Sequence, residues 1–112
     1  MRIRAAHDVR SKTAVIDATA SGDTPVVAGV SGRKIRLLSF FFVSSAAVSV
    51  KFRDDAGSPK DLTGPMPVAA NGGVVSHVTC QGYVGETGRG QALNINLSAA
   101  SNVGGQVCYV EV

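Results

Sequence analysis

The feature that most restricts the fold of this chain is a strict alternation of apolar and polar residues in two segments. The segment 92–98 places Leu93, Ile95 and Leu97 two residues apart, with asparagine or serine after each. The segment 48–54 repeats the pattern with two valines and a phenylalanine. Consecutive side chains of a strand point to opposite faces, so a period of two predicts strands that bury one face. We therefore expect Leu93, Ile95 and Leu97 to point into a core.

The rest of the chain is typical of short strands joined by tight turns. Glycine is abundant, with 13 residues, whereas the residues typical of helical bundles are scarce. Turn signals at 21–23, 31–32 and 71–73 divide the chain. Pro25 predicts an edge strand, because proline cannot donate to a sheet ladder. The expected strands are 13–18, 24–29, 34–45, 48–54, 62–66, 74–79, 92–98 and 106–112. About eight strands at this spacing predict an antiparallel β-sandwich of the jelly-roll type.

The length of 112 residues predicts a single domain, over 12–112, preceded by an extended basic arm over 1–11. Four basic residues open the chain and are opposed only by Asp8; they are Arg2, Arg4, Arg10 and Lys12. The net charge of +3 is too small to require a nucleic-acid partner. The arm is either a disordered tail or a strap that becomes ordered on an acidic partner.

No arrangement of residues predicts catalysis, a metal site or a cofactor. His77 and Cys80 are three residues apart in an expected strand, which puts them on opposite faces. Asp54 and Asp55 are expected in a solvated turn, and the glycine-rich segment 81–90 in an exposed loop. No apolar stretch resembles a secretion signal or a membrane span, so we expect reduced thiols and Cys108 as a small core residue.

Three consecutive phenylalanines, Phe40, Phe41 and Phe42, lie in the longest expected strand. Because neighbouring side chains of a strand face opposite ways, at least one phenylalanine must leave the core of this domain. A bulge or a covering loop could hide it. Burial against another subunit is the alternative, because small domains seldom leave large apolar patches exposed.

The stretch 30–112 resembles small structural proteins of tailed-phage virions. The segments that carry the resemblance are VSGRKIRLLSFFFVSSAAVSVKF, LTGPMPVAANGGVVS and GETGRGQALNINLSAASNVGGQVCYVEV, in this order. The resemblance implies a non-enzymatic capsid decoration (cement) protein on the virion surface, made in the host cytoplasm. It implies a homotrimer that binds the major capsid protein, with no nucleic-acid or membrane partner. A module at the tip of a fibre or spike that binds host-surface carbohydrate or protein is the alternative.

On this interpretation, Arg2, Arg4, Arg10 and Lys12 are the candidate capsid-binding residues of the arm. Phe40, Phe41 and Phe42 are the candidate subunit interface. Each arm would bridge neighbouring capsomers, and three linked arms would gain effective concentration.

Overall fold

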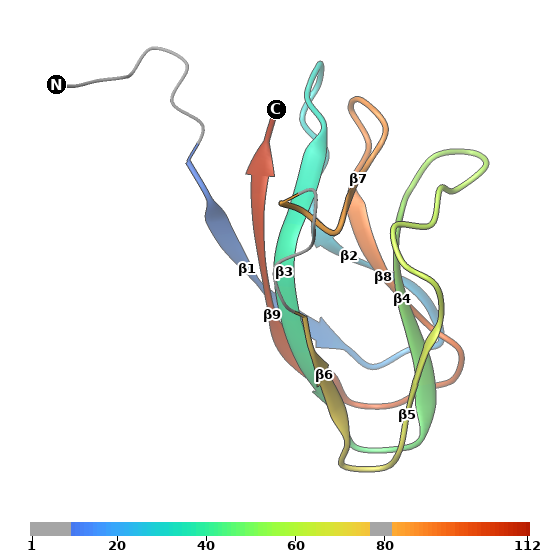
Figure 1. Ribbon diagram of the computed structural model, residues 1–112. Helices are drawn as coiled ribbons and strands as arrows, with labels where there is room; N and C mark the ends of the chain where they lie inside the picture. Colours follow the sequence, from blue (N-terminus) through green and yellow to red (C-terminus); the bar gives the residue numbers. More distant parts are fainter. Residues whose placement is uncertain (1–9, 77–81) are drawn as a thin grey trace, which may run out of the picture.

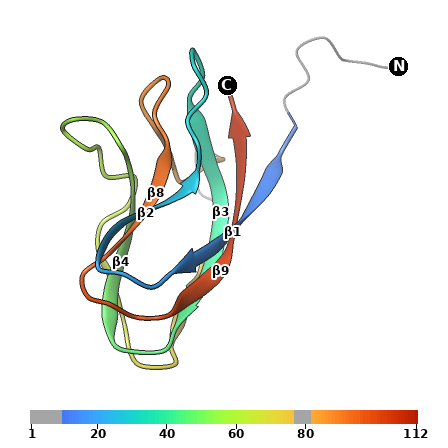
Figure 2. The same cartoon turned by 180° about the vertical axis from the view of Figure 1, so that it is seen from behind.

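The computed structural model describes residues 10–76 and 82–112, which form two antiparallel sheets packed as a β-sandwich (Figure 1). The described residues contain nine strands and no helix. The all-β sandwich expected from the sequence is therefore confirmed. Figure 2 shows the same two layers from behind.

The first sheet has the strand order β1–β9–β3–β6, and β7 pairs with β3 on the same side as β6. Its strands are β1 (Lys12–Ala18), β3 (Ile35–Ser44), β6 (Gly73–Val75), β7 (Gly85–Glu86) and β9 (Val103–Glu111). The second sheet has the order β2–β8–β4–β5. Its strands are β2 (Gly22–Val27), β4 (Val48–Asp54), β5 (Met66–Val68) and β8 (Leu93–Leu97). Strand β2, which contains Pro25, lies at an edge as expected.

The core is built from the inward faces of both sheets, and the two alternating segments form the centre of the second sheet. Leu93, Ile95 and Leu97 are all buried, as predicted. In the paired strand β4, Val50 and Phe52 are fully buried beside them. The period of two in these segments thus identifies the buried face correctly.

Strand β3 changes its buried face halfway along. Ile35 and Leu37 are buried in the first half, and Phe40 and Phe42 in the second. The pairing with β9 shifts between Leu37 and Ser39, which is the register of a β-bulge. One extra residue reverses the alternation, because each added residue turns the following side chains to the other face.

The second half of β3 is apolar on both faces, because Phe40 and Phe42 point inward and Phe41 and Val43 point outward. Phe40 packs against Phe52 of the opposite sheet, with ring centroids 4.8 Å apart. Phe42 is also buried, whereas Phe41 is 48% exposed on the outer face. The prediction that at least one phenylalanine leaves the core is confirmed, and the residue is Phe41.

Two expected elements differ from the structure. The segment 62–66 is not a strand; the short strand there is Met66–Val68. The segment 81–90 is not simply an exposed loop, because β7 pairs with β3 and Thr87 is buried. The Oγ1 of Thr87 accepts a hydrogen bond from the Ile35 amide at 3.0 Å, so this part of the loop is attached to the sheet. His77 and Cys80 lie outside the described residues.

Candidate functional site: an apolar sheet face and a basic end

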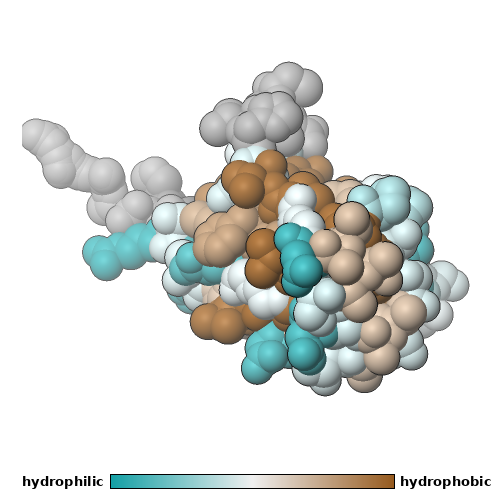
Figure 3. All heavy atoms as spheres, turned by 90° about the horizontal axis from the view of Figure 1, so that it is seen from below, coloured by the Kyte–Doolittle hydropathy of each residue, from teal (hydrophilic) through white to brown (hydrophobic). Residues whose placement is uncertain are grey.

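The outer face of the first sheet carries an apolar patch, which we define as Val15, Phe41, Val43 and Val75. The strand register aligns one row of residues across this face: Val15 of β1, Gln106 of β9, Phe41 of β3 and Val75 of β6. Val15 is 74% and Val75 79% exposed. Figure 3 shows hydrophobic residues gathered along one side of the molecule. Four large, exposed apolar side chains on one sheet face mark a surface that another molecule can cover.

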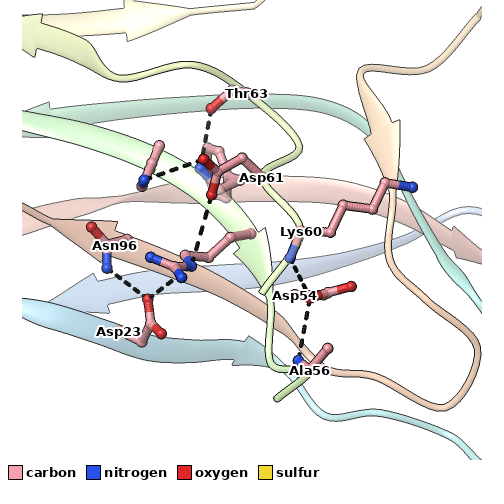
Figure 4. Close-up of polar contacts among 10 residues, drawn as sticks. Asp23, Asp54, Ala56, Lys60, Asp61, Thr63 and Asn96 are labelled. Carbon is pink, nitrogen blue, oxygen red and sulfur yellow. Dashed lines mark hydrogen bonds and ion pairs between the residues drawn. The ribbon is translucent and has the colours of Figure 1, made fainter. Parts of the chain in front are cut away.

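The outer face of the second sheet is different, because it carries a network of charges (Figure 4). Arg53 lies between two carboxylates, with Nε 3.8 Å from Asp23 Oδ1 and 3.8 Å from Asp61 Oδ1. Asn96 donates a hydrogen bond to Asp23 at 2.7 Å, and Lys51 lies 3.3 Å from Asp61. The sandwich thus has one polar face suited to water and one apolar face that is not.

Of the predicted interface residues, the structure leaves Phe41 accessible. Phe40 and Phe42 bury their side chains in the core, so they support the position of Phe41 from beneath. Cys108 was expected in the core, which is wrong: it is half-buried on the outer face, beside Phe41 and Val75. The physical reason is that Val107 occupies the inward position of β9, so the next residue faces outward.

Basic side chains gather at the end of the sandwich where β3 begins and β9 ends. We call this the basic end; its members are Arg10, Lys12, Arg33, Lys34, Arg36, Lys60 and Arg89. Within the described chain, only Lys51 and Arg53 are basic residues outside it. Its acidic residues are Asp54, Asp55, Glu86 and Glu111. The positive charge of the molecule is therefore concentrated at one end and is not confined to the first twelve residues.

Glu86 neutralises part of this charge. Arg36 Nε donates to Glu86 Oε2 at 3.0 Å, and Lys34 Nζ lies 3.7 Å from the other carboxylate oxygen. The hydrogen bond from Arg36, followed by the charge of Lys34, holds the pKa of Glu86 below its usual value despite some burial. Arg36 also lies over the ring of Tyr83, 4.6 Å from its centroid. Arg33, Lys60 and Arg89 remain exposed around this cluster.

Asp54 organises the loops of the basic end. The expectation of a solvated turn is wrong, because Asp54 is only 2% exposed. Its carboxylate accepts backbone hydrogen bonds from Lys60 at 2.8 Å and Ala56 at 3.2 Å (Figure 4). A third backbone hydrogen bond comes from Gly88 at 3.1 Å. Burial alone would raise the pKa of Asp54, but these three donors outweigh it and lower that pKa. One buried carboxylate thus joins two loops that carry exposed cations.

The candidate arm residues have different surroundings. Arg2 and Arg4 lie outside the described residues, and Arg10 is exposed just before β1. Lys12 is the first residue of β1, and its Nζ lies 2.8 Å from Glu111 Oε1. The neighbouring carboxylate raises the pKa of Lys12 through this hydrogen bond and its charge. The charge of Lys12 is thus partly compensated within the domain.

A hollow at the opposite end of the first sheet has no counterpart in the sequence analysis. It has a volume of about 470 Å³ and opens to solvent. Its polar rim includes Asp17, Asn71 and Asn102, which come from three separate parts of the chain. The sequence indicates turns at Asn71 and Asn102 and a strand that ends just after Asp17, but none of these signals shows that the three residues meet.

Among residues 10–76 and 82–112, no three potential ligands from His, Cys, Asp and Glu group as a metal site. The same residues contain no helix long and apolar enough to cross a membrane. In comparisons with known proteins, no family model, no curated protein and no solved structure matches this chain.

Proposed function

We propose that this chain is a structural protein of a phage virion, a decoration protein that binds the assembled head as a homotrimer. The proposed role is structural and not catalytic. The observation that carries it is the separation of two surfaces on one small domain: an apolar sheet face and a basic end. The first suits self-association, and the second suits attachment to an acidic surface.

The apolar patch is the proposed subunit interface. A second copy of this chain is the occupant we favour, because the patch is apolar and uncharged whereas the opposite sheet face carries a network of charges. Three copies that cover the row formed by Val15, Phe41 and Val75 would remove these side chains from water. Val43, which lines the hollow at the end of the sheet, would stay at the uncovered edge of the patch. The hydrophobic gain of about 25 cal/mol per Å² would then favour assembly.

The basic end, together with the arm over 1–11, is the proposed capsid-binding region. Residue 10 leads into β1 beside Glu111, so the arm starts from the same end that carries Arg33, Lys60 and Arg89. An acidic capsid surface would meet both sets of cations. Each exposed ion pair contributes only about 0–1 kcal/mol, so attachment depends on the sum over three subunits.

Co-sedimentation with heads that lack the decoration protein tests this proposal. The wild-type protein should sediment with the heads, and deletion of residues 1–11 should weaken binding while leaving the fold and the oligomer intact. The triple variant Arg2→Ala, Arg4→Ala, Arg10→Ala should also bind less tightly at low salt. At about 1 M salt the Debye length falls to about 3 Å, so the difference between variant and wild type should shrink.

Equal binding of the triple variant and the wild type at low salt would show that the arm is a passive tail. A charge-neutral control is Ser11→Ala, which should bind like the wild type. If neither the wild type nor any variant sediments with the heads, the decoration role itself is wrong.

We also propose that the sandwich is a jelly roll. The chain crosses from one sheet to the other at most of its connections, the exceptions being β4 to β5 and β6 to β7, and the first strand pairs with the last. The order β1–β9–β3–β6 in one sheet and β2–β8–β4–β5 in the other supports this proposal. An experimental structure would test this, since a jelly roll requires both Greek-key connections.

A further inference from the structure

The hollow lies over a row of the first sheet in which two of the four residues are glycines. The strand register aligns this row as Asp17 of β1, Gly104 of β9, Val43 of β3 and Gly73 of β6. Gly104 forms the floor between Asp17 and Val43. A Cβ on Gly104 would meet only the Ile16 carbonyl oxygen, at 3.8 Å, so the space above this glycine is open.

Three turns close the hollow and are fixed to one another by the backbone. The Asn71 amide donates to the Ser44 carbonyl at 2.8 Å, and the Ser45 amide donates to the Asn102 carbonyl at 3.0 Å. The Asn102 amide donates to Ser45 Oγ at 3.2 Å. Beneath them, the hydroxyls of Ser44 and Ser101 lie 2.6 Å apart. The rim is thus held in place before any ligand arrives.

The side chains on this rim keep their hydrogen-bonding groups available. Among the described residues, no hydrogen bond or ion pair uses the side chains of Asp17, Asn71 or Asn102. All three are exposed and surround the same hollow. A carboxylate accepts hydrogen bonds, and an amide both donates and accepts them, so the set can pair with several hydroxyl groups at once.

We infer that this hollow binds a neutral saccharide, through Asp17, Asn71 and Asn102 around the floor formed by Gly104. The exposed side chain of Val43 beside Gly104 offers an apolar contact for the C–H face of a sugar ring. No lysine or arginine lines the hollow, and Asp17 repels phosphate, sulfate or carboxylate groups. The volume of about 470 Å³ lies within the usual range of small-ligand sites. This inference does not depend on the decoration role, because the hollow lies at the other end of the molecule from the basic end.

An NMR titration of the full chain tests the inference. Glucose, galactose, mannose and N-acetylglucosamine are each added to about 50 mM, a concentration that detects millimolar affinity. At least one of these sugars should shift the amide signals of Asn71, Asn102 and Gly104. Inorganic phosphate at the same concentration should leave these signals in place.

Variants separate specific binding from a general effect of the sugar. Gly104→Val fills the floor without a backbone clash and should abolish the shifts. The matched control Gly57→Val adds the same side chain in an open loop at the basic end, and should bind like the wild type. Asn71 has φ 61°, so Asn71→Gly keeps the turn while removing the amide, and should weaken binding about three- to tenfold.

Two results would overturn the inference. One is the absence of shifts with all four sugars, or shifts with phosphate alone. The other is wild-type binding by Gly104→Val. Either result leaves the capsid proposal standing, since that proposal is tested by co-sedimentation with heads.

Discussion

The contribution of a buried polar residue to the stability of this protein depends on whether its side chain finds hydrogen-bond partners. Asn94 and Asp54 are both buried polar residues on strands of the second sheet, but they differ in this respect. Asn94 Oδ1 has no hydrogen-bond partner, whereas the Asp54 carboxylate accepts three backbone hydrogen bonds. The unpaired oxygen of Asn94 therefore lowers the stability of the fold, whereas the hydrogen-bonded carboxylate of Asp54 raises it.

Truncation of the core residue Ile95 should strongly reduce stability. Ile95 is fully buried at the centre of the second sheet, so Ile95→Ala should lower the free energy of unfolding by about 2–5 kcal/mol. Asn94→Ala on the same strand should cost far less, because it removes an amide whose oxygen is already unpaired. Urea denaturation of both variants measures the difference. Equal midpoints would mean that the assignment of faces in β8 is wrong.

Asp54 should make stability depend on pH in the acid range. Its pKa in the folded protein is lowered below the unfolded value of about 3.9, so the carboxylate stabilises the fold above about pH 4. This contribution is lost as the pH falls through the folded pKa. Asp54→Asn should remove about 1.5–3 kcal/mol at pH 7, the usual value of a hydrogen bond to a charged group.

Denaturation of the wild type, Asp54→Asn and the exposed control Asp17→Asn at pH 7, 5 and 3 provides the measurement. The loss between pH 5 and 3 should be smaller in Asp54→Asn than in the other two proteins. An unchanged pH dependence in Asp54→Asn would contradict the role of this carboxylate.

At the scale of elements, the bulge in β3 decides which of its side chains point into the core, and a glycine of β9 decides how closely β9 can approach β3. Gly105 is paired with Phe42 and Ile16, and a Cβ there would collide with the Phe41 carbonyl. Its neighbour Gly104 has open space. The close approach of β9 to β3 therefore depends on one of the two glycines.

Alanine substitution at these two neighbours should change the stability of the protein differently. Gly105→Ala should destabilise the protein by about 1–3 kcal/mol, because backbone must move to admit the methyl group. Gly104→Ala should be neutral or stabilising by about 0.4–1 kcal/mol, since it restricts the unfolded chain without a clash. Thermal unfolding of both variants compares them directly. A stable Gly105→Ala would argue against the close strand approach.

At the scale of the whole molecule, apolar and charged surfaces are sorted to different faces and ends. The polar network around Arg53 covers the second sheet, the apolar patch covers the first, and cations gather at the basic end. Such sorting gives each surface a separate role in assembly.

Phe41→Ser should therefore weaken the proposed trimer without unfolding the domain. Phe41 is 48% exposed in the single chain, so a polar residue there costs little until subunits associate. Light scattering after size exclusion should report about three times 11.5 kDa for the wild type and a smaller mass for Phe41→Ser. Val30→Ser, at an exposed valine outside the patch, should leave the mass unchanged. A monomeric wild type at micromolar concentration would remove the argument for this interface.

The sequence by itself determined that the chain is an antiparallel β-sandwich, which faces of β4 and β8 are buried, and that one phenylalanine of 40–42 must leave the core. These inferences succeed because alternation is a local property of a strand. Only the tertiary structure decided that the outward residue is Phe41, that Asp54 is buried, and that Cys108 faces outward. It also brought the cations of distant loops to one end and Asp17, Asn71 and Asn102 around one hollow. Each of these outcomes depends on which strand pairs with which, and in what register, and that information lies in contacts between segments far apart in the chain.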